Sequence, residues 1–61
     1  MSERIIVNPK ILGGKPVIRG TRIPIHLILE LLVAGYDFKL IIKAYPDLTE
    51  EDIKAAIEFK N

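Results

Sequence analysis

The sequence predicts a mainly α-helical fold, in which a short N-terminal β-hairpin precedes a three-helix bundle of the helix-turn-helix kind. Three observations support this prediction. A segment rich in glycine and proline covers residues 13–24, an apolar run overlaps its end and continues beyond it, and two later segments each follow a helix-capping residue. Because the chain has only 61 residues, we expect one domain over 1–61, with the hairpin region in 1–24 and the bundle in 25–61.

The first predicted element is a short strand from Arg4 to Val7. Its residues 5–7 are β-branched, which favours an extended conformation. Asn8-Pro9 then ends the strand, because this dipeptide is typical of a turn.

A tight hairpin is predicted over residues 17–23. If Gly20 and Thr21 are the two central loop residues, glycine occupies the position that a type II′ turn requires, and its φ should be positive. In this register Ile18 pairs with Ile23 on one face of the hairpin.

The same register places Arg19 opposite Arg22, and like charges in that position are unfavourable. An anion bound between the two side chains would remove the repulsion. A turn centred on Arg19 and Gly20 would instead separate the arginines, so the sequence leaves both registers open.

A very apolar helix is predicted from Ile25 to Ala34, directly after Pro24, which suits a helix start. Eight of its ten residues are apolar, so it lacks a polar side of the usual width. It could simply be the core of the chain. Because so short a chain cannot cover a helix on all sides, we favour an interpretation in which one face is the interface of a homodimer. The interface residues expected on this basis are Leu27, Ile28, Leu31 and Leu32.

A second helix is expected from Phe38 to Ala44. Gly35 suits the left-handed residue that ends the preceding helix, and Asp37 is a good N-cap for the new one. Pro46 stops the helix.

A third helix is predicted to begin after the N-cap Thr49, with Glu50, Glu51 and Asp52 in its first turn. In helix-turn-helix proteins that read DNA, the first residues of this helix face the base edges. DNA phosphates would repel three carboxylates there, so the usual docking on DNA is disfavoured. The apolar residues expected to face the core are Ile53, Ala56 and Ile57.

Charge is distributed unevenly along the chain. Residues 1–24 carry a net charge of +4 and residues 25–61 a net charge of −3. This could be ordinary surface charge, or it could indicate an anionic partner for the first part of the chain. On the second interpretation, the residues expected to bind a partner protein or nucleic acid are Lys15, Arg19, Arg22, Lys39 and Lys43.

Little in the sequence indicates an enzyme. The chain has no cysteine and one histidine, His26, which lies in the apolar helix and is expected to be a packed or interface residue. Gly13-Gly14-Lys15 lacks the helix that follows a phosphate-binding loop. We expect no catalytic activity, cofactor, metal or small-molecule substrate. No signal peptide is visible and the apolar run is too short to cross a bilayer, so we expect a cytoplasmic protein without membrane contact.

Three elements of the sequence together resemble the small prokaryotic family catalogued as domain of unknown function 433: GGKPVIRGTRIP, the Gly35 after the apolar helix, and YPDLTEEDIKAAI. The likeness covers nearly the whole chain. It implies a homeodomain-like, tri-helical unit with an N-terminal β-hairpin. It also implies an antitoxin-like role, because members are commonly encoded beside PIN-like toxin proteins. It brings no established catalytic residues.

Two functions therefore compete. The first is an antitoxin that binds and neutralises a PIN-like ribonuclease toxin and also binds its own promoter DNA. The alternative is a stand-alone, dimeric, DNA-binding transcriptional regulator. A toxin gene next to the gene for this chain would favour the first.

Overall fold

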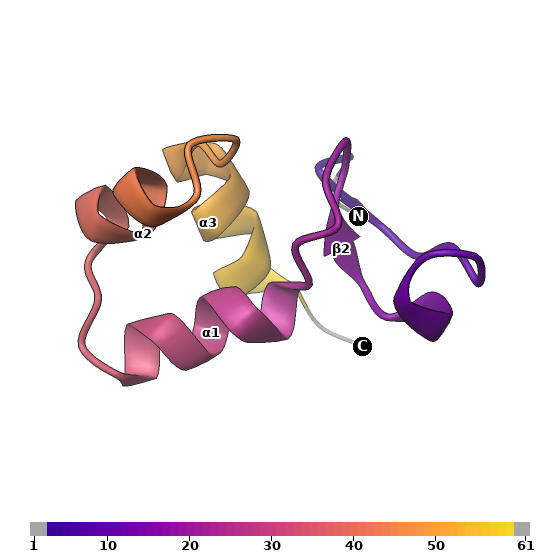
Figure 1. Cartoon of the computed structure of the whole chain (residues 1–61), viewed down its shortest axis with the longest axis horizontal. Coiled ribbons are helices and arrows are strands. Elements are labelled where there is room, and N and C mark those ends of the chain that lie inside the picture. Colours follow the sequence, from indigo (N-terminus) through magenta and orange to yellow (C-terminus); the bar gives the residue numbers. More distant parts are fainter. Residues whose placement is uncertain (1–2, 60–61) are drawn as a thin grey trace.

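Three helices and a short two-stranded antiparallel sheet form the computed structural model, which describes residues 3–59 (Figure 1). Their order along the chain is β1 (Ile5–Ile6), the 3-10 turn η1 (Leu12–Gly14), β2 (Val17–Ile18), α1 (Ile25–Val33), α2 (Phe38–Ala44) and α3 (Glu50–Glu58). The predicted fold class is thus confirmed. The molecule measures 29 × 20 × 19 Å, and β2 and α2 lie toward opposite ends of its long axis (Figure 1).

The sheet joins the start of the chain to the hairpin segment. Ile5 lies opposite Ile18, and the ladder continues where the Arg19 N–H donates to the Arg4 carbonyl at 2.7 Å. On its other side, Ile18 donates its N–H to the Ile23 carbonyl at 3.0 Å, which confirms the predicted pairing of these two residues. β2 is therefore held from both sides, by β1 and by the segment that leads into α1.

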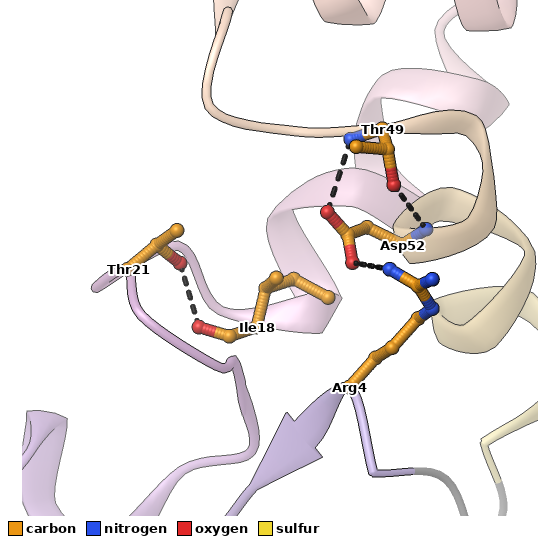
Figure 2. A network of polar contacts seen from close by, with 5 residues as sticks. All are labelled: Arg4, Ile18, Thr21, Thr49 and Asp52. Carbon is orange, nitrogen blue, oxygen red and sulfur yellow. Dashed lines mark hydrogen bonds and ion pairs between the residues drawn. The ribbon is translucent and has the colours of Figure 1, made fainter.

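The turn after β2 differs from the favoured prediction. The Thr21 N–H donates to the Ile18 carbonyl at 3.0 Å, so Arg19 and Gly20 are the central residues. Gly20 has φ 81°, the positive value expected, but at the second central position, where a type II turn needs glycine. The type II′ turn centred on Gly20 and Thr21 is wrong. The Thr21 hydroxyl explains the choice, because it donates to the Ile18 carbonyl at 2.8 Å (Figure 2) and also accepts from the Ile23 N–H at 3.0 Å.

The helices end and begin where the sequence predicts, to within a residue. Gly35 has φ 101° just after α1, and the Asp37 carboxylate accepts from the Leu40 N–H at 2.8 Å at the start of α2. No helix in the described residues has the length and apolarity needed to cross a membrane.

The core lies where α1, α2 and α3 meet the sheet. Its fully buried members include Ile18, Ile28, Ile41, Leu48 and Ile53. In α3, Ala56 is buried as predicted, but Ile57 is half exposed and Ala55 is buried in its place. The buried face of α3 consists of Asp52, Ile53, Ala55 and Ala56. Because this face packs against β1 and α1, Ile57 points outward.

Candidate functional site

The strongest candidate for a binding surface is the basic end of the molecule, formed by the side chains around β2 and its flanking turns. Lys15, Arg19 and Arg22 were predicted to bind a partner, and all three are exposed there. Lys10 is exposed in the same N-terminal part of the chain. We call these four side chains the basic end: Lys10, Lys15, Arg19 and Arg22.

The turn described above fixes where the arginines lie. Because Arg19 is a central turn residue, it is not paired with Arg22 across a ladder. The register in which an anion would bind between these two arginines is therefore not the one observed. Its neighbour across the sheet is Arg4 instead.

The Arg4 side chain has a structural role, because it connects two elements of the fold. Its guanidinium lies 3.1 Å from Asp52 Oδ1, in a salt bridge that joins β1 to the start of α3 (Figure 2). The Asp52 side chain is only 10% exposed, and its other oxygen accepts from the Thr49 N–H at 3.0 Å. The Thr49 hydroxyl in turn accepts from the Asp52 N–H at 3.2 Å, which completes a capping box. Asp52 is therefore a structural residue.

The basic end has no such internal partner. Within residues 3–59, the side chains of Lys10, Lys15, Arg19 and Arg22 form no salt bridge with a carboxylate. Four positive charges within residues 10–22 are thus presented to solvent. They can bind carboxylates or phosphates, and the arginines can do so with two parallel hydrogen bonds.

The two lysines of α2 do not belong to this surface. Lys39 and Lys43 are exposed and line a shallow hollow of about 320 Å³ together with Gly35, Asp37 and Leu40. α2 lies at the far end of the long axis from β2 (Figure 1). The five predicted binding residues therefore form two separate surfaces.

One residue of the predicted dimer interface on α1 needs correction. Ile28 is fully buried in the core of its own chain, so it has no surface to offer to a second copy. Leu31 and Leu32 are partly buried and pack against that core, and Leu27 is of intermediate exposure. Leu27, Leu31 and Leu32 keep part of their surface exposed, so an interface at these three residues stays a prediction.

The start of α3 carries exposed negative charge, since Glu50 and Glu51 both face solvent. His26 is exposed, so it is not packed within its own chain, and its place at an interface stays a prediction. No group of three or more His, Cys, Asp or Glu side chains within residues 3–59 is placed to hold a metal ion.

Comparison of the sequence with known protein families identifies the family of this chain. The family model described as "Protein of unknown function (DUF433)" matches residues 5–59. The chain belongs to the DUF433 family. The resemblance drawn from the glycine, proline and arginine motifs is thereby confirmed.

Individual relatives agree with this assignment. Protein y4eO of Sinorhizobium fredii is 39% identical over 54 residues, which are 88% of this chain but 24% of that protein. A protein of Archaeoglobus fulgidus is 61% identical over 23 residues, 38% of this chain and 64% of that protein. The crystal structure of a DUF433 member from Anabaena variabilis has a TM-score of 0.83 and 37% identity, covering 88% of this chain and 54% of the solved one. The chain thus spans about a quarter of y4eO and about half of the solved relative.

Proposed function

We propose that this DUF433 protein is the antitoxin-like component of a toxin–antitoxin pair, and that it neutralises a PIN-like ribonuclease toxin by binding it through the basic end. The observation that supports the proposal is the set of exposed cations at Lys10, Lys15, Arg19 and Arg22, which have no carboxylate partner within residues 3–59. An acidic surface on a partner protein would supply carboxylates for these cations.

The fixed backbone around Arg19 favours binding to a carboxylate. Arg19 is held by a turn that three hydrogen bonds close, so its backbone needs little further ordering when it binds. A guanidinium on a fixed backbone can form paired hydrogen bonds with a carboxylate at a lower entropic cost than a lysine on a flexible loop.

Promoter DNA is the competing ligand, because phosphates suit the same cations. The usual recognition surface of a helix-turn-helix protein would be the start of α3, and there Glu50 and Glu51 face solvent. DNA would therefore have to be bound by backbone contacts at the basic end alone, which predicts weak sequence specificity and steep salt dependence.

The experiment compares two charge-matched variants. Arg19→Ala/Arg22→Ala and Lys39→Ala/Lys43→Ala each remove two positive charges, from opposite ends of the molecule. Each variant is titrated into the PIN-like protein encoded beside this gene, and ribonuclease activity is measured at equal chain concentrations. We expect the arginine variant to lose inhibition by at least about tenfold, since two charged contacts of roughly 1 kcal/mol each are removed. The lysine variant should inhibit like the parent.

A gene neighbourhood without a PIN-like protein, or equal inhibition by the parent and both variants, would contradict the proposal. If instead the parent binds its promoter with a steep dependence on salt and does not inhibit the neighbouring protein, the stand-alone DNA-binding regulator is the better description.

A further inference from the structure

α2 and α3 each carry an exposed stripe on the side turned away from the core. On α2, Leu40 is 45% exposed, and Lys39 and Lys43 run beside it one helical turn apart. On α3, Ile57 is 50% exposed, and the outward side also holds Glu50, Glu51, Lys54 and Glu58. Each stripe therefore combines one large apolar side chain with charges of predominantly one sign.

The signs of the two stripes are opposite. The exposed side of α2 has two lysines. The Asp37 carboxylate, which lines the same hollow, already caps the helix by accepting from the Leu40 N–H. The exposed side of α3 has three glutamates and one lysine. Charge complementarity of this kind selects and orients a partner, while apolar contact supplies affinity.

The two stripes cannot meet within one chain. α2 and α3 pack against each other through their inner faces, where Ile41 and Ile53 are fully buried. The outer faces point away from that contact. A second copy of the chain presents the matching stripe without any rearrangement.

We propose that the protein self-associates by seating the outer face of α3 from one copy in the hollow beside α2 of another. In this contact Ile57 packs on Leu40, while Glu51 and Glu58 face Lys39 and Lys43. The hollow beside α2 is shallow and open to solvent, so a side chain of a second copy can reach it. If the contact closes with two-fold symmetry, it forms twice. It is distinct from the predicted α1 interface, of which Ile28 is fully buried, and it does not depend on the proposed toxin.

Charge reversal tests the pairing directly. Lys39→Glu/Lys43→Glu and Glu51→Lys/Glu58→Lys each put like charges face to face, and both leave the capping box of Thr49 and Asp52 intact. Sedimentation equilibrium of the purified protein alone should show the parent associating and each variant weakened by at least about tenfold. An equimolar mixture of the two variants should associate again, because the reversed charges then match.

A second pair of variants, one test and one control, probes the apolar part of the contact. Ile57→Ser should weaken association, whereas Val7→Ser, at a side chain that is 59% exposed near β1, should not. Circular dichroism checks that every variant is folded. A parent that is monomeric at all accessible concentrations would overturn the proposal, as would association that survives both charge reversals or a mixture that does not recover.

Discussion

Asp52 is the residue whose replacement should reveal most about what holds this small fold together. The change is Asp52→Ala, which shortens the side chain to a methyl group at a site that is 7% exposed. It removes the acceptor for the Thr49 N–H and the anion beside Arg4 at once. Alanine is a good helix former, so the loss should not come from helix propensity.

The magnitude follows from the two contacts. Loss of the carboxylate from the capping box should cost about 1–2 kcal/mol, within the range for helix caps and for hydrogen bonds to charged groups. The Arg4 salt bridge adds about 0–1 kcal/mol, because the Arg4 side chain is 48% exposed and water screens it. The expected total is about 1–3 kcal/mol, a large fraction of the roughly 3–9 kcal/mol that 61 residues typically provide.

Thermal and urea unfolding followed by circular dichroism measure this loss. A cost near the middle of the range should lower the melting temperature by roughly 10–15 °C. Arg4→Gln, measured beside it, should cost about 1 kcal/mol or less. In the double variant, the Arg4 change should cost less than it does in the parent, because the salt bridge with Asp52 is already lost. An Asp52→Ala protein within 0.5 kcal/mol of the parent, roughly the scatter of surface substitutions, would refute the assigned role of the carboxylate.

Two further predictions concern the hairpin and the core. Gly20→Val should destabilise the protein by about 1–3 kcal/mol through its positive φ alone, because an added Cβ meets no atom within 4 Å. Gly20→Asn, which tolerates this conformation, should cost clearly less in the same urea titration, and equal costs would rule out backbone strain as the cause. Ile28→Ala should cost about 2–5 kcal/mol, because the side chain is fully buried. A cost within the scatter of surface positions would mean that α1 does not pack as described.

The sequence predicts the helices well because the signals for their ends are local. Asp37 and Thr49 each need only a backbone N–H three residues further on, and both form that bond. Gly35 needs only its own φ to end α1. Such features lie within a few residues of one another, so reading the chain in order is enough to find them.

Contacts between distant segments leave no comparable signal. Arg4 and Asp52 are 48 residues apart, and neither position differs in kind from other charged positions along the chain. The sequence leaves the register of the turn open because either pair of central residues suits glycine, and the Thr21 hydroxyl decides between them. The outward position of Ile57 likewise depends on which side of α3 faces the sheet, and that is a property of the assembled fold.

The long-range contacts also bring the basic first part of the chain next to part of the acidic remainder. The salt bridge of Arg4 with Asp52 joins the basic first part of the chain to the acidic start of α3, and Arg4 lies next to Arg19 in the sheet. Glu50 and Glu51 are exposed and directly precede Asp52, so exposed negative charge begins next to this salt bridge. A partner with uniform negative charge, such as duplex DNA, would gain from contact with the arginines and would be repelled wherever it also met these glutamates. A protein surface can place carboxylates opposite Arg19 and lysines opposite the glutamates, so that both contacts are favourable. This mixture of charge supports the proposal of a protein as the partner at the basic end.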